Sequence, residues 1–127
     1  MNHMQALVDG MSQRGQKDRA ASQMTLGGLI EALEQMPADT PVCNLNAAHS
    51  YRGYYCDLAF EQGEGTRPAN ELLAECRAAM GEVFEGYKGG DYVMGKLTPV
   101  WVAHYGSCGE KLLTIATDGT ITTEEGD

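Results

Sequence analysis

The clearest pattern in the chain is a run of apolar residues at helical spacing, three or four positions apart. Its members are Leu26, Leu29, Ile30, Leu33 and Met36. Thr25 precedes the run and has a hydroxyl that can cap a first turn, and Pro37 follows it, where proline ends helices. The pattern therefore predicts a helix between these two residues.

A second apolar stripe predicts another helix in the middle of the chain. Pro68 stands where a first helical turn accepts proline, and Gly81 stands where helices commonly stop. Between them the apolar positions are Leu72, Leu73, Cys76, Ala79 and Met80. We expect this helix to bury that stripe.

Strands are predicted where polar and apolar residues alternate. Val42 and Leu45 follow a proline, and residues 54–61 alternate with a period of two, which predicts two strands joined around residues 49–53. The polar segment 61–67 is expected to be a turn. Further strands are expected after the second helix, within three segments separated by glycine-rich turns: 83–94, 98–106 and 110–117.

The order of these elements predicts an α+β fold, with a mostly antiparallel sheet of about five to six strands and two helices. The pair Asp118-Gly119 favours a tight final hairpin. Residues 1–23 lack sustained periodicity, and we expect a flexible N-terminal extension there. Residues 24–127 then form a single ligand-binding domain, a size that buries a core without metal or disulfide.

Charge narrows the classes of partner. The 127 residues include 18 acidic and 9 basic side chains, for a formal charge of −9. Sequence-independent binding to nucleic acid requires clustered Lys and Arg, so this class is excluded, and an anionic membrane surface is disfavoured. No apolar run reaches the roughly 18 residues of a membrane span, and residues 1–23 lack the hydrophobic block of a secretory signal. We therefore expect a cytoplasmic protein.

Residues that commonly carry catalysis form no recognisable motif. The four cysteines, expected to be reduced thiols without a metal, have no CxxC spacing: Cys43, Cys56, Cys76 and Cys108. His49 beside Ser50 and His104 near Cys108 leave a small nucleotide hydrolase as a further alternative. Asp57 is expected to be solvated or paired with Arg52, and Trp101 to lie in the core. We expect no enzymatic activity, no metal and no cofactor.

Two short stretches combine a cation, aromatic rings and glycines. They are SYRGYY (residues 50–55) and FEGYKGGDY (residues 84–92). Glycine permits close backbone approach to a ligand, aromatic faces stack on bases, and Arg or Lys pairs with phosphate. Neither stretch has the spacing of a P-loop or of a dinucleotide-binding turn. The other interpretation is that both are ordinary tyrosine-rich hairpin ends, with Arg52 and Lys88 paired to nearby carboxylates.

Residues 24–117 as a whole resemble a known family. The resemblance lies in the element order and in three segments, MTLGGLIEALEQMPADTPV, HSYRGYYCDLAFE and FEGYKGGDYVMGKLTPVWVAHYGSCG. The chain resembles the phage-encoded sponge family that counteracts Thoeris immunity. This resemblance implies a protein that sequesters a cyclic ADP-ribose-type signal without cleaving it, with cyclic oligonucleotides as a second class of ligand. It also implies a homo-oligomer with ligand pockets between subunits.

The resemblance implies ligand-binding roles for four residues. Arg52 is then a phosphate partner, and Phe84, Tyr87 and Lys88 supply stacking and phosphate contacts. The family's binding arginines nearer the C-terminus have no counterpart, because no arginine follows Arg77. The resemblance therefore does not specify which of the two ligand classes this chain binds.

An acidic inhibitor of a host defence nuclease, of the DNA-mimic or anti-CRISPR type, is the main alternative function. Residues 24–127 carry sixteen acidic side chains against six basic ones, and such a surface attracts a basic groove. The acids are scattered along the chain, however. Of the six cations, only Arg52 and Lys88 lie among aromatic rings and glycines, so these two are the testable phosphate partners.

Overall fold

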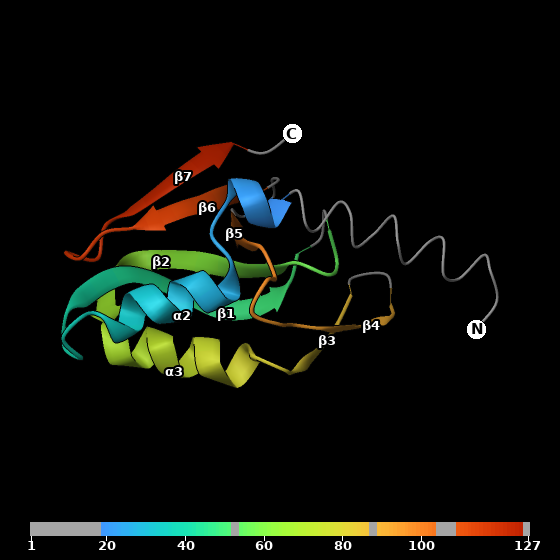
Figure 1. Cartoon of the computed structure of the whole chain (residues 1–127), viewed down its shortest axis with the longest axis horizontal. Coiled ribbons are helices and arrows are strands. Elements are labelled where there is room, and N and C mark those ends of the chain that lie inside the picture. The colour runs from blue at the N-terminus through green and yellow to red at the C-terminus, as the bar shows by residue number, and fades with distance from the viewer. Residues whose placement is uncertain (1–18, 52–53, 87–88, 104–108, 126–127) are drawn as a thin grey trace.

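The computed structural model describes residues 19–51, 54–86, 89–103 and 109–125, and it shows an α+β fold. In this part of the chain five strands form the main sheet: β1 (Pro41–Ser50), β2 (Leu58–Pro68), β5 (Val100–Ala103), β6 (Glu110–Ile115) and β7 (Ile121–Glu125). The other elements are a separate hairpin of β3 (Val83–Glu85) and β4 (Asp91–Val93), and the helices α2 (Leu26–Glu34) and α3 (Ala69–Ala79) (Figure 1). The expected fold class is confirmed.

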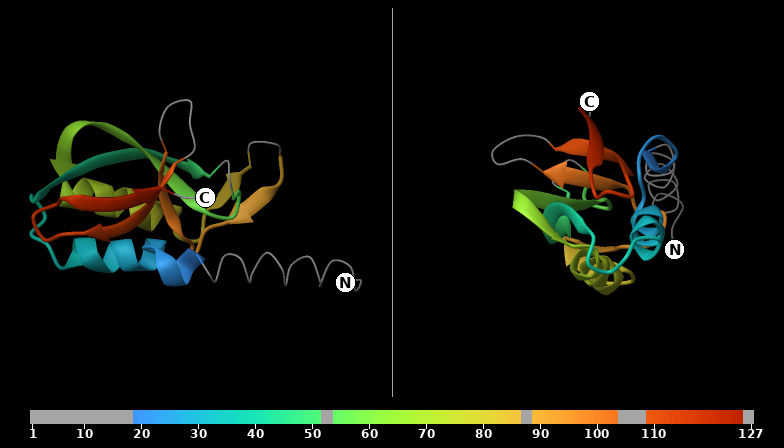
Figure 2. Two further views of the ribbon diagram at one scale, coloured as in Figure 1. Left: turned by 90° about the horizontal axis from the view of Figure 1, so that it is seen from above. Right: turned by 90° about the vertical axis from the view of Figure 1, so that its left-hand side faces the viewer.

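Both predicted helices are present, for the predicted reasons. The Thr25 hydroxyl accepts a hydrogen bond from the amide of Gly28 at 3.1 Å and so caps α2. Pro68 is the N-cap of α3, and Gly81 follows that helix with φ +79°, a conformation that glycine adopts without strain. The two helices pack against each other along one side of the sheet (Figure 2). Their apolar stripes bury Leu26, Leu29, Leu33, Leu72, Cys76 and Ala79.

The main sheet is mostly antiparallel with one parallel pair. Its strand order is β1-β2-β5-β6-β7, and only β2 and β5 run parallel. The connection between these two strands contains α3 and the β3–β4 hairpin, as a parallel crossover requires a long connection. The parallel register places Leu58 beside Val100 and Ala59 beside Trp101. This register aligns the start of β2 with the start of β5.

Two details of the predicted strands are wrong. The polar segment 61–67 is not a turn but belongs to β2, which pairs with β1 up to Pro41 opposite Pro68. Exposed strand positions accept polar side chains when the backbone is paired, and local polarity does not reveal this pairing. The second strand also begins at Leu58 rather than at Tyr54, because the amide of Asp57 donates to the carbonyl of Tyr54 at 2.9 Å and closes a turn.

The final hairpin forms where the Asp-Gly pair predicts it, between β6 and β7. Gly119 has φ +90°, and its amide donates to the carbonyl of Ala116 at 2.9 Å. A Cβ at Gly119 would overlap the carbonyl oxygen of Pro41. Only glycine fits this turn, because both the backbone conformation and the close approach of β1 exclude a side chain.

The chain packs on the domain from residue 19 onward, five residues earlier than the predicted boundary. Residues 19–22 are helical, and Gln23 is buried with its side-chain amide donating to the carbonyl of Val100 at 2.8 Å. The backbone of Met24 bonds to both Leu112 and Val100, at 2.7 and 2.9 Å. Residues 1–18, the rest of the predicted extension, lie outside the described ranges.

Candidate functional site

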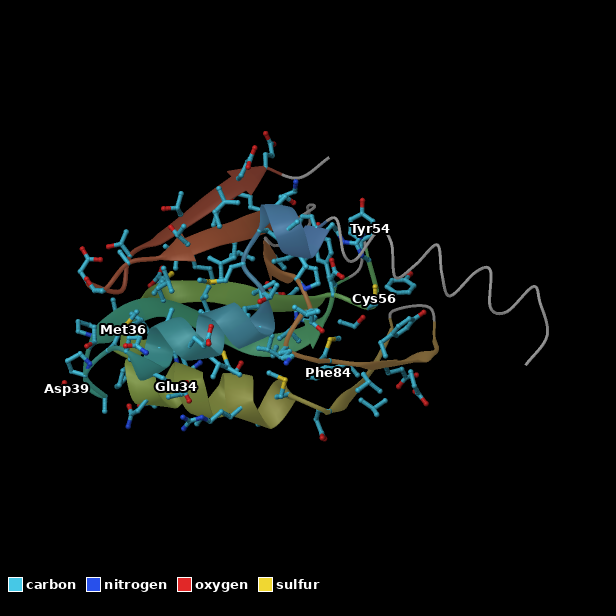
Figure 3. All side chains as sticks on the ribbon, viewed as in Figure 1. Glu34, Met36, Asp39, Tyr54, Cys56 and Phe84 are labelled. Atoms are coloured by element: carbon cyan, nitrogen blue, oxygen red, sulfur yellow. The ribbon has the colours of Figure 1, made fainter. Side chains whose placement is uncertain are left out.

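The two glycine- and tyrosine-containing stretches meet at one end of the molecule. The rings of Tyr55, in the turn before β2, and Tyr92, in β4, are in edge contact with centroids 5.8 Å apart. Figure 3 shows Tyr54, Cys56 and Phe84 at this end, near the β3–β4 hairpin. We call this region the aromatic end and define it by Tyr51, Tyr54, Tyr55, Phe84 and Tyr92. Residues 37 positions apart in sequence thus build one surface.

Gly86 allows the hairpin to close against these rings. A Cβ at Gly86 would lie 2.8 Å from Cε2 of Tyr92, 2.9 Å from the carbonyl of Gly89 and 3.3 Å from Cδ2 of Tyr55. Its amide donates to the carbonyl of Gly90 at 2.9 Å. Gly89 and Gly90 both have positive φ, a conformation that glycine adopts without strain. Glycine at position 86 is therefore required for the close packing of the two tyrosines.

Of the four predicted ligand-binding residues, the structure describes one. Phe84 lies in β3 opposite Tyr92, is half-buried and packs against the hydrophobic core. Arg52, Tyr87 and Lys88 lie outside the described residues. The structure therefore brings together the residues that flank these three positions and places Phe84 on the inner side of the hairpin.

A buried carboxylate lies next to the aromatic end, and this corrects the expectation that Asp57 is solvated. Arg52, the other expected partner, lies outside the described residues. The side chain of Asp57 is 0% exposed. Arg19 donates to it from two nitrogens, Nε to Oδ2 at 2.6 Å and Nη2 to Oδ1 at 3.1 Å. The indole Nε1 of Trp101 donates to Oδ2 at 2.8 Å. A buried carboxylate of this kind needs such partners, because its desolvation is otherwise uncompensated.

Aromatic rings stack above this carboxylate. Tyr51 and Trp101 are parallel to within 9° with centroids 4.4 Å apart, and Tyr54 stacks on the same indole at 5.8 Å. The Tyr51 hydroxyl accepts a hydrogen bond from the amide of Gly109 at 3.0 Å. The guanidinium carbon of Arg19 lies 3.8 Å from the centre of the Tyr54 ring, a cation–π contact. Trp101 is 2% exposed, which confirms its expected place in the core.

Sequence reasoning missed Arg19 altogether. This residue lies in a segment without periodicity, and its partner is 38 positions away. Burial lowers the pKa of Arg19, but the hydrogen bond and charge of Asp57 outweigh that effect, so the pKa is raised above its usual value. No local pattern could have identified this pair, because the pairing depends on where the N-terminal segment packs.

The described cysteines are not arranged for nucleophilic catalysis. Burial raises the pKa of Cys43, Cys56 and Cys76, in the case of Cys76 to about 12. A raised pKa opposes formation of the thiolate, which is the nucleophile and the metal ligand. Within the described ranges no group of three His, Cys, Asp or Glu residues could hold a metal ion.

The two histidine pairs considered from the sequence have different outcomes. Nδ1 of His49 lies 2.8 Å from the carbonyl of Ala47, and the Ser50 hydroxyl donates to the carbonyl of Tyr55. Both side chains therefore interact with backbone groups rather than with each other. His104 and Cys108 lie outside the described residues.

A shallow groove of about 300 Å³ lies between α2 and α3, at the opposite end of the molecule from the aromatic end. Its lining comprises Leu33, Glu34, Met36, Ala38, Asn70, Leu73 and Arg77. Glu34 and Arg77 form an exposed ion pair at 2.7 Å within this lining. The groove contains none of the residues that the sequence singled out for ligand binding.

Comparisons with protein families, with curated proteins and with solved structures found no match to this chain. Among the described helices, none combines the length and the apolar character needed to cross a membrane.

Proposed function

We propose that this protein is a phage anti-defence protein that binds a cyclic nucleotide immune signal in the host bacterial cytoplasm and sequesters it without cleavage. The ligand is of the cyclic ADP-ribose type, with cyclic oligonucleotides as the second class. The observation that carries this proposal is the contact between Tyr55 and Tyr92, at 5.8 Å between ring centroids. It joins the two stretches that each combine aromatic rings, glycines and a cation.

The chemistry of the aromatic end supports a ligand with a planar base. Tyr54 is 38% exposed, and Tyr55 and Tyr92 are half-buried, so ring surface borders solvent at this end. Base-to-ring stacking contributes about 1–3 kcal/mol per base. Arg52 and Lys88 are the cations next to these tyrosines in sequence, and we assign phosphate binding to them. A homo-oligomer would enclose the ligand between subunits better than one small domain.

Sequestration requires tight binding and no stabilisation of a transition state. The described thiols have raised pKa values, and His49 and Ser50 interact with backbone groups. These features disfavour a small nucleotide hydrolase that uses His49 with Ser50, while His104 and Cys108 lie outside the described residues. In the proposed mechanism the protein binds the ligand and the ligand stays chemically unchanged.

The proposal is tested by calorimetric titration with cyclic ADP-ribose and with a cyclic dinucleotide. We expect saturable binding of one class and recovery of the intact molecule after heat denaturation, measured by mass spectrometry. Recovery of a hydrolysed product would refute sequestration. Salt-sensitive binding to a basic defence nuclease, with no small molecule retained, would favour the acidic inhibitor instead.

The same titration, repeated with substituted proteins, locates the binding site. Arg52→Ala and Lys88→Ala should each weaken binding about tenfold or more, as expected for loss of one charge-assisted contact. Gly86→Ala should also weaken it, because its Cβ would press on Tyr92 and Tyr55. The matched control is Gly95→Ala, whose Cβ meets nothing within 4 Å. Unchanged affinity in all three test variants would place the site elsewhere.

A further inference from the structure

We propose that Asp57, Tyr54 and Trp101 form a guanidinium-binding site, which Arg19 fills within the chain and which accepts the arginine side chain of another molecule when Arg19 is withdrawn. This site shares Tyr54 with the aromatic end, but the inference does not rest on the proposed nucleotide binding. Its basis is the contact of one planar cation with the Asp57 carboxylate, with the ring of Tyr54 and with Sγ of Cys56, at 3.6 Å from Nη2. Trp101 contributes by donating to the same carboxylate.

The carboxylate of Asp57 receives the guanidinium side-on. Nε and Nη2 of Arg19 reach different oxygens of this carboxylate, at 2.6 and 3.1 Å. Such a two-point contact requires the planar fork of arginine, and the ammonium group of lysine cannot reproduce it. The pocket is therefore selective for guanidinium over ammonium.

The carboxylate is held in place by groups other than Arg19. Trp101 Nε1 donates to Oδ2 at 2.8 Å, and the main chain of Asp57 bonds to Tyr51 and Tyr54, both at 2.9 Å. The side chain of Asp57 is 0% exposed. Because it is buried, its attraction for a cation is much less screened than at the surface.

The aromatic wall completes the site and borders solvent. The ring of Tyr54 faces the guanidinium carbon at 3.8 Å. Tyr54 is 38% exposed and the Arg19 side chain is 15% exposed, so the cation lies at the edge of the protein rather than deep within it. A guanidinium group from solution or from a partner can therefore reach this position once Arg19 leaves it.

The occupant and the pocket come from separate parts of the chain. Tyr54 and Asp57 belong to the turn before β2 and Trp101 to β5, whereas Arg19 belongs to the helical residues 19–22 at the start of the described chain. Removing the Arg19 side chain thus leaves the three pocket groups in place. This separation makes chemical rescue possible.

The test uses the full-length Arg19→Ala variant with added guanidinium chloride at low millimolar concentration. Thermal unfolding and the fluorescence of Trp101, the one tryptophan of the chain, report on the site. We expect a lowered melting temperature and a saturable recovery with guanidinium. At about ten times its dissociation constant, guanidinium should raise the folding equilibrium constant about tenfold. Nα-acetyl-arginine amide should act in the same way.

The controls separate the site from general solvent effects. Urea, a neutral molecule of the same shape, sodium chloride at equal ionic strength, and Nα-acetyl-lysine amide should not rescue the variant. Arg77→Ala, which removes an exposed arginine, should show no rescue. The Arg19→Ala, Asp57→Asn double variant should also show none.

Each outcome decides the proposal. Selective rescue by guanidinium and by the arginine amide supports it. Equal effects of guanidinium and urea, or an Arg19→Ala variant as stable as the parent, would overturn it. If Arg19→Ala does not fold unaided, the yield on refolding with guanidinium against urea gives the same decision.

Discussion

Two ion pairs of this protein have almost the same length and very different surroundings. Arg19 and Asp57 lie 2.6 Å apart with side chains 15% and 0% exposed, whereas Arg77 and Glu34 lie 2.7 Å apart with side chains 57% and 43% exposed. The distance between the charged atoms therefore does not show how much each pair contributes to the free energy of unfolding. The difference in burial decides it, because water and salt screen the exposed pair and not the buried one.

The two pairs also differ in what happens when one partner is lost. Either side chain of the Arg77–Glu34 pair can turn to solvent at little cost. The Asp57 side chain cannot turn to solvent in this way, because its carboxylate is enclosed by Trp101 and by the turn that begins at Tyr54. Loss of Arg19 should therefore destabilise the fold far more than loss of Arg77, whose ion pair with Glu34 lies exposed at the groove between α2 and α3.

The largest effect is expected from Arg19→Ala. Loss of the cation leaves a buried carboxylate without its charge partner, which costs about 3–5 kcal/mol of unfolding free energy. Denaturant unfolding followed by circular dichroism measures this cost. Asp57→Ala should cost less, because Arg19 is already 15% exposed and can reach water. A loss below about 1 kcal/mol for Arg19→Ala would show that the buried pair does not differ from a surface pair.

A smaller effect is expected from Trp101→Phe, which keeps an aromatic ring beside Tyr51 and removes the Nε1 donor. Asp57 Oδ2 then loses one of its two hydrogen bonds, at a cost of about 1–3 kcal/mol. Unfolding by circular dichroism gives the measurement, since the variant has no tryptophan to follow. A neutral substitution would mean that the donors of Arg19 and the thiol of Cys56 satisfy the carboxylate without the indole.

The smallest effect is expected from Arg77→Ala, at less than about 1 kcal/mol, because the pair is exposed. Comparing unfolding at low and at 1 M salt sharpens the contrast. Added salt should reduce the difference between Arg77→Ala and the parent and leave most of the Arg19→Ala difference intact. Equal salt sensitivity of the two variants would contradict the role assigned to burial.

Local patterns predicted most elements of the fold. Apolar spacing and caps placed α2 and α3, and the Asp118-Gly119 pair placed the β6–β7 hairpin. The polar segment 61–67 was predicted wrongly, because its strand conformation depends on pairing with β1. Local spacing thus reveals elements that bury their own apolar face and misses those that rely on a neighbour.

The candidate site was predicted in part. The two stretches with glycines and tyrosines were identified from composition, and the structure places Tyr55 of one against Tyr92 of the other. Phe84 packs toward the core, while the phosphate roles of Arg52 and Lys88 stay predictions. For Asp57 the sequence predicts solvation or pairing with Arg52, since nothing in its neighbourhood in sequence signals a partner 38 residues earlier.

The sequence by itself determined the two helices, the hairpins, the acidic charge and the residue types available at the aromatic end. Only the tertiary structure decided which of these residues meet. The parallel pairing of β2 with β5 sets Ala59 beside Trp101. It thereby brings Asp57, two residues before Ala59, within hydrogen-bonding distance of the indole. Periodicity and caps report on residues a few positions apart, whereas burial of Asp57 and Arg19 depends on the packing of segments distant in the chain.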